Sequence, residues 1–102
     1  RESHHVVAIY GATELGELIY LVLKDAGVER IEFLDESRTG RFLGMPIHRI
    51  ESVDHARYVK VMVAYPNDMI EHRDRLIAAG VPESKISSLL DHPESSKVRE
   101  VE

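Results

Sequence analysis

A loop framed by two glycines is the part of this sequence whose residue types and spacing best fit a chemical role. Gly11-Ala12-Thr13-Glu14-Leu15-Gly16 follows an apolar run and precedes a helical pattern, which is the setting of a dinucleotide-binding fingerprint. Gly11 permits a tight turn, Gly16 permits close packing of helix on strand, and free N–H groups at a helix start attract phosphate. The loop therefore predicts a phosphate site, or a turn whose glycines serve packing alone.

Two residues of this loop count against a dinucleotide ligand. Thr13 occupies the position of the middle glycine of G-x-G-x-x-G, and that glycine lets the backbone approach a pyrophosphate closely. Glu14 places an acid where the anion would lie. Thr13 therefore weakens the case for NAD(P), and Glu14 opposes an anion of any kind at this position.

A second group of candidate residues follows the next apolar run. An acid such as Asp35 at the end of the second strand commonly accepts a hydrogen bond from a ribose hydroxyl. It also suits a turn ahead of Glu36 and Ser37. Arg38 and Arg41 follow in the same loop, either as phosphate partners or as solvated side chains.

The other reactive residue types form no recognisable catalytic or metal-binding pattern. No H-x-x-x-H or H-E-x-x-H spacing links His48, His55, His72 and His92, so no metal site is expected. His72 is interpreted as solvated on a charged helix face, and His92 either approaches the site or belongs to a chain turn. Ser87 and Ser88 have no neighbouring base, and the chain has no cysteine, so no nucleophilic catalysis is predicted.

Composition limits the class of protein further. The 102 residues suit one domain, with 43% hydrophobic and 30% charged residues. The net charge of −5 disfavours direct binding to nucleic acid, which requires a basic face. The sequence shows no apolar run near the roughly 18 residues of a membrane span and no signal-peptide pattern, so we expect a cytoplasmic protein without membrane attachment.

The apolar pattern predicts the elements that would position these candidates. We expect strands at 6–10, 30–34, 45–48, 58–64 and 85–90, a loop at 36–44 and one helical turn within 51–57. We expect one helix at 14–26 and a second that is capped by Asn67 or Asp68 and runs to about 79. Thr13 is expected to cap the first helix and Gly27 to end it. The inward face of the second helix is expected to carry Met69, the stem of Arg73, Leu76 and Ile77.

Alternation of apolar strands with helices predicts an α/β domain: a small Rossmann-like three-layer fold with a mainly parallel sheet. We expect this domain to span residues 1–92, with 93–102 as a polar tail or linker. Ligands of such sheets lie beyond the carboxyl ends of the strands. The predicted site therefore combines the loops 11–16, 35–38 and 64–68.

The order of several short motifs resembles a known family. Val-Val-Ala-Ile-Tyr-Gly-Ala, Ile-Glu-Phe-Leu-Asp-Glu, Leu-Gly-Met-Pro-Ile, Val-Met-Val-Ala-Tyr-Pro-Asn-Asp, Leu-Ile-Ala-Ala-Gly-Val-Pro and Ile-Ser-Ser-Leu-Leu follow one another along the chain. This order resembles the N-terminal domain of bacterial sugar O-/N-acyltransferases of the sialic-acid and bacillosamine acetyltransferase type, and related domains of polysaccharide-biosynthesis proteins. The resemblance covers residues 6–92.

The resemblance implies that the domain binds the nucleotide part of a UDP-sugar. The loop 11–16 would meet phosphate or sugar, Asp35 and its neighbours Glu36 and Arg38 the uridine side, and Ala64, Tyr65 and Asn67 the facing wall. The acyl-transfer machinery of that family lies in hexapeptide repeats, which this chain does not contain. The resemblance therefore implies binding without acyltransferase activity in this chain.

Three hypotheses follow for the function. The first is a binding module for a nucleotide or nucleotide sugar, with a small-molecule partner and no catalysis by this chain alone. The second is a degenerate Rossmann domain with a regulatory or dimerisation role, which would make a homo-oligomer. The third is an NAD(P)-binding oxidoreductase domain, for which no Tyr/Lys catalytic motif is recognisable.

Overall fold

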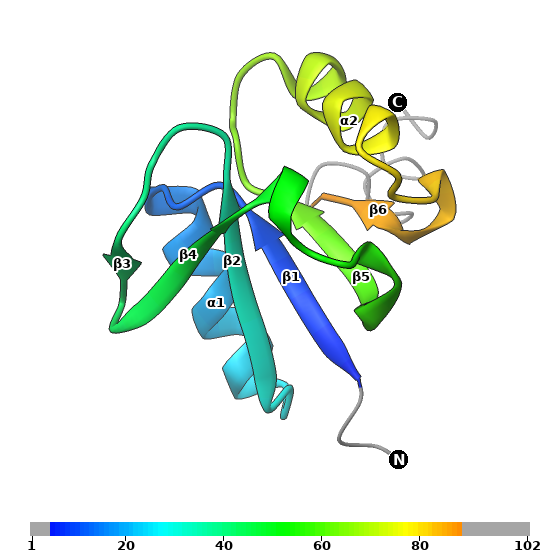
Figure 1. Cartoon of the computed structure of the whole chain (residues 1–102). Coiled ribbons are helices and arrows are strands. Elements are labelled where there is room, and N and C mark those ends of the chain that lie inside the picture. The colour runs from blue at the N-terminus through cyan, green and yellow to red at the C-terminus, as the bar shows by residue number, and fades with distance from the viewer. Residues whose placement is uncertain (1–4, 89–102) are drawn as a thin grey trace, which may run out of the picture.

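The computed structural model describes residues 5–88 (Figure 1). Its strands are β1 (Val6–Tyr10), β2 (Arg30–Asp35), β3 (Arg41–Phe42), β4 (Met45–Arg49), β5 (Tyr58–Val63) and β6 (Ile86–Ser87). Its helices are α1 (Glu14–Asp25) and α2 (Met69–Ala78), with short 3-10 turns at Ile50–Ser52, His55–Arg57 and Glu83–Lys85.

The six strands form one sheet in the order β3-β4-β2-β1-β5-β6. All neighbours pair in parallel except β3 with β4. From β1 the chain passes to β2 on one side and later returns to β5 on the other, so the strand order reverses between β1 and β5. The prediction of an α/β domain with a mainly parallel sheet is confirmed.

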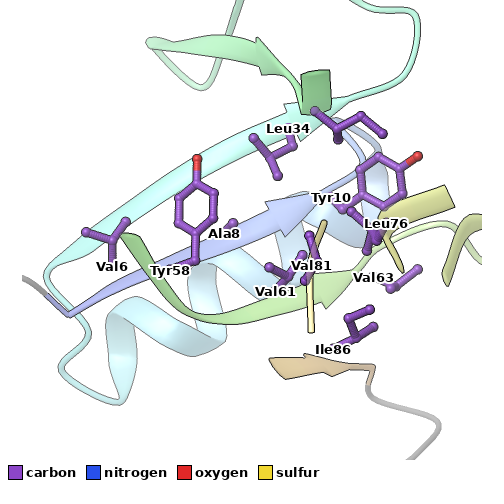
Figure 2. Close-up of a cluster of buried hydrophobic side chains, with 11 residues drawn as sticks. Val6, Ala8, Tyr10, Leu34, Tyr58, Val61, Val63, Leu76, Val81 and Ile86 are labelled. Carbon is purple, nitrogen blue, oxygen red and sulfur yellow. The ribbon is translucent and has the colours of Figure 1, made fainter. Parts of the chain in front are cut away.

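The central strand β1 explains why the sheet needs cover on both faces. All five of its residues are buried, because it lies between two strands and under helices on each side. Tyr10 and Leu76 of α2 belong to the buried cluster of one face (Figure 2), whereas Ile9 and Ile19 of α1 belong to that of the other. The three-layer arrangement follows from these two cores.

The helix α1 forms as its sequence predicts. The Thr13 side chain accepts a hydrogen bond from the N–H of Gly16 at 3.0 Å and so caps the first turn. Ile19 packs into the core at 1% exposure. The helix ends before Gly27, whose φ of 94° is readily available only to glycine.

The segment 36–44 differs from the predicted loop, because it contains β3. Leu43 and Gly44 both have positive φ, at 53° and 80°, and form the two-residue turn of a β-hairpin between β3 and β4. Phe42 packs edge-on against Phe33 with ring centroids 5.0 Å apart. Arg41 and Phe42 show no strand pattern in the sequence, and they pair with β4 because Phe42 packs on the core.

The second helix also departs from its prediction in three respects. Asp68 precedes α2 in the left-handed region, with φ of 58°, and its side chain makes no capping hydrogen bond. Leu76 is buried as expected, whereas Ile77 is 40% exposed. His72, interpreted as solvated, instead lies at the sheet, with its side chain only 13% exposed.

Some predictions concern the limits of the described chain. The expected single turn within 51–57 is two short 3-10 turns. The last predicted strand, 85–90, corresponds to β6, while residues 89 and 90, His92 and the tail 93–102 lie outside the described residues. Between residues 5 and 88, neither helix has the length and apolar character needed to cross a membrane.

Candidate functional site

The three predicted loops meet at one edge of the sheet. They follow β1, β2 and β5, which are adjacent parallel strands, so their carboxyl ends lie together (Figure 1). The strand order reverses between β1 and β5 at this edge, and ligands of open α/β sheets bind at such a point. The candidate site is therefore the edge of the sheet that carries the loops 11–16, 35–38 and 64–68.

Both glycines of the first loop are required by close packing. Gly11 has φ of 129°, and a Cβ atom there would lie 3.0 Å from the carbonyl oxygen of Ala64. A Cβ atom on Gly16 would lie far inside van der Waals contact with the carbonyl oxygen of Gly11. The structure therefore needs both glycines for packing. Phosphate binding by this loop stays a prediction, and it is compatible with this packing.

The start of α1 leaves main-chain donors available. The N–H of Ala12 donates to Asp35 Oδ2 at 2.8 Å, and that of Gly16 donates to the Thr13 side chain. Within residues 5–88, the N–H groups of Thr13, Glu14 and Leu15 make no hydrogen bond. Three donors at the positive end of a helix dipole can bind an anion.

Asp35 connects the second loop to the first. Asp35 as a whole residue is 3% exposed. Its carboxylate accepts hydrogen bonds from the N–H groups of Ala12, Ser37 and Arg38 at 2.8–2.9 Å. Burial alone would raise the pKa of Asp35, but these main-chain hydrogen bonds outweigh it and lower the pKa. The geometry fits the turn interpretation of this residue, and its contact with a ribose stays a prediction.

Arg38 is held beside the glycine loop. Its Nη1 atom donates to the carbonyl oxygen of Ala12 at 2.6 Å, and its guanidinium lies 5.1 Å from the centre of the Phe42 ring. A guanidinium has five N–H donors, so this anchoring leaves others for a ligand. Arg41 instead donates to the carbonyl oxygen of Gly44, in its own hairpin.

The loop after β5 closes onto the first loop. The N–H of Ala64 donates to the carbonyl oxygen of Tyr10 at 2.8 Å, and the Thr13 hydroxyl donates to that of Ala64 at 2.7 Å. Tyr65 follows on the α2 side, half-buried, and Asn67 lies in the exposed turn before α2. The structure thus brings Ala64 against the glycine loop and leaves Asn67 at the rim.

A polar cluster that sequence reasoning missed lies on the α2 side of this edge. The Glu36 carboxylate accepts hydrogen bonds from the hydroxyl of Tyr10, from His72 Nδ1 at 2.6 Å and from Arg75 Nη1 at 2.6 Å. The His72 ring stacks on Tyr65, with centroids 3.9 Å apart. These five residues come from β1, the loops after β2 and β5, and α2.

The hydrogen bonds of this cluster fix the charge of Glu36. Burial alone would raise the pKa of this carboxyl, but the bonds from Arg75, Tyr10 and His72 hold it at about 2. Burial, followed by the hydrogen bond to Glu36, raises the pKa of Tyr10 far above its usual range. Burial is also the largest cause of the raised pKa of Tyr65. At neutral pH the cluster is thus an ionised carboxylate among neutral tyrosines.

Metal binding has no support in the described part of the chain. No group of three or more His, Cys, Asp or Glu side chains between residues 5 and 88 is placed to hold an ion. Asp35 and Glu36 are adjacent in sequence, but each is occupied by its own set of donors.

Comparison with known proteins shows the fold and little more. No protein-family model and no curated protein matches the sequence. A solved structure, the crystal structure of RSP, a Rex-family repressor, matches with a TM-score of 0.61 at 16% sequence identity. The match covers 95% of this chain and 57% of that chain, so this chain spans just over half of that repressor's length. None of these comparisons links the chain to sugar acyltransferases, and together with the sheet order they show a Rossmann-like α/β fold.

Proposed function

We propose that this domain binds a phosphate-bearing nucleotide at the start of α1. The observation that carries the proposal is the set of unengaged N–H groups of Thr13, Glu14 and Leu15 at the carboxyl edge of the sheet. Arg38, whose Nη1 atom donates to the carbonyl oxygen of Ala12, adds a cation beside the same loop. Main-chain donors and a fixed guanidinium are the groups that bind phosphate in proteins.

A UDP-sugar is the first ligand to test and NAD(P) the second. The resemblance to nucleotide-sugar-binding domains favours the UDP-sugar. Thr13 disfavours a dinucleotide, because its side chain bridges Ala64 and Gly16 where the fingerprint has a glycine. Asp35 already accepts three main-chain N–H groups, so a ribose hydroxyl would share its oxygens.

Glu14 provides a test of the proposal, because its charge is expected to have opposite effects on the stability of the free domain and on the binding of an anion. This exposed acid in the first turn of α1 stabilises the helix through the dipole, by about 0.3–1 kcal/mol. The same charge opposes an anion bound at the same N–H groups. Glu14→Gln is therefore expected to lower the thermal stability of the free domain and to tighten its binding of nucleotide.

The experiment is a thermal-shift titration with UDP, UDP-N-acetylglucosamine, NAD and NADP. A ligand at about a hundredfold over its dissociation constant stabilises the folded state by about 2.7 kcal/mol. We expect a shift with the UDP ligands, a weaker affinity in Arg38→Gln and a stronger affinity in Glu14→Gln. Arg57→Gln is the matched control, since Arg57 pairs with Glu32 at 2.7 Å and directly precedes β5, at the opposite edge of the sheet. A thermal shift that is the same in Arg38→Gln, Glu14→Gln and the unmodified chain would mean that the ligand binds elsewhere.

A second candidate function is regulation without a nucleotide. The glycine loop is tied to its neighbours by Asp35, Thr13 and Arg38, so it needs no ligand to hold its shape. One solved structure that matches the fold is a repressor, of which this chain spans 57%, and this second candidate gives the domain the role of a regulatory part of a longer protein. No thermal shift with any of the four nucleotides would favour this candidate.

A further inference from the structure

The outer face of α1 carries an apolar surface that nothing in the described chain covers. Leu18, Leu21 and Val22 are 51%, 55% and 50% exposed, although each is large and hydrophobic. They lie three and four residues apart, which places them together on a helix. The side of α1 with Ile19 packs on the sheet. Leu18 and Leu21 lie on the outer face, and Val22, three residues after Ile19, lies at the margin between the two sides.

Charged residues flank this surface in a self-complementary order. Glu17, Leu21 and Lys24 follow one another at spacings of four and three, so they form one row along α1. Both charged residues are exposed. If a second α1 lies antiparallel over this row, its Lys24 comes opposite Glu17, its Leu21 opposite Leu21, and its Glu17 opposite Lys24.

In this arrangement a two-fold axis passes beside Leu21. It brings Glu17 of each copy opposite Lys24 of the other and places the two Leu21 side chains in contact. Leu18, three residues before Leu21, forms the adjacent part of the same contact. Glu14 and Asp25 lie beyond this row at the two ends of α1, and Asp25 is turned about 100° around the helix from Lys24. Contacts of this isologous kind are the commonest among symmetric protein pairs.

We propose that the outer face of α1 is a dimer interface, and that its occupant is the α1 of a second copy of this chain in antiparallel orientation. The charge order selects this partner, because a parallel copy would bring Glu17 against Glu17. The proposal is independent of the nucleotide site. One helix pair is smaller than a standard interface of about 800 Å² per partner, so the dimer is expected to dissociate on dilution.

The experiment is sedimentation equilibrium of the full chain over a range of concentrations. Glu17→Lys and Lys24→Glu each create two like-charge pairs, so we expect each to raise the dissociation constant at least about tenfold. The double variant exchanges the charges and is expected to restore the dissociation constant of the unmodified chain. Only an interface in which these two residues face each other across copies gives this rescue.

Two further variants complete the test. Leu21→Glu is expected to abolish association, because it places a carboxylate on the two-fold axis, and circular dichroism checks that the exposed substitution keeps the fold. Ile70→Lys is the matched control, since Ile70 is the most exposed large apolar residue of α2. A chain that is monomeric at every concentration, a double variant without rescue, or a dimer broken by Ile70→Lys would each overturn the proposal.

Discussion

Replacing Glu36 with glutamine removes the charge at the centre of the cluster while keeping the shape of the side chain. The carboxylate is 24% exposed and accepts hydrogen bonds from Tyr10, His72 and Arg75. A carboxyl whose pKa falls from 4.5 to about 2 is stabilised in its charged form by about 3 kcal/mol. We expect Glu36→Gln to lose about 2–3 kcal/mol of the free energy of unfolding at pH 7.

The same shift predicts how the loss depends on pH. Because the folded-state pKa of Glu36 is depressed, its contribution is present above pH 4.5 and is lost as pH falls toward 2. The variant has no carboxyl to protonate at this position. The difference between the two proteins should therefore be constant from pH 7 to about 5 and shrink steadily below that range.

Urea unfolding followed by circular dichroism, from pH 7 down to the lowest pH at which both proteins fold, measures this difference. Glu83→Gln is the control, because Glu83 pairs with Arg73 at 2.6 Å while its side chain is 67% exposed, and exposed pairs contribute about 0.2–1 kcal/mol. Asp35 also has a lowered pKa, but it is present in both proteins and cancels. A loss below about 1 kcal/mol, or a difference independent of pH down to 3, would refute the assignment of Glu36 as the charged centre.

Two further predictions concern the glycine loop. Gly16→Ala is expected to destabilise the domain by about 1–3 kcal/mol or more in thermal unfolding, because the new methyl group meets the carbonyl oxygen of Gly11; alanine is otherwise the better helix former, so any stabilisation would contradict the packing geometry. Thr13→Val removes the helix cap and the bond to Ala64 and should lose about 1–2 kcal/mol in urea unfolding. Thr13→Ser keeps the hydroxyl and should lose less; equal losses would show that the methyl group, not the hydroxyl, matters.

The elements that sequence predicts well are those with a local physical cause. The buried run of β1, the apolar stripe of α1 and the Thr13 cap are each determined by residues within a few positions of one another. Asp35 was predicted at the end of a strand, and its two interpretations differ only in which donors surround it. That difference depends on the N–H of Ala12, which comes from another strand end.

What the sequence did not predict depends on residues that folding brings together. Tyr10, His72 and Arg75 lie 26, 36 and 39 positions from Glu36, and none of these spacings is a pattern. From the sequence, Tyr10 is indistinguishable from the other apolar residues of its strand, and His72 from the other polar residues of a charged helix. Only the parallel order of β2, β1 and β5 places their ends beside α2.

The adjacent carboxylates Asp35 and Glu36 organise opposite sides of the same edge. Asp35 holds the glycine loop through the N–H of Ala12, and Glu36 holds α2 through His72 and Arg75. Since both carboxylates already accept hydrogen bonds within the fold, a ribose hydroxyl would share their oxygens with those partners. We therefore expect that the phosphate, bound at the start of α1, contributes most of the affinity for a nucleotide, and that UDP binds nearly as tightly as its sugar conjugates, whereas uridine does not.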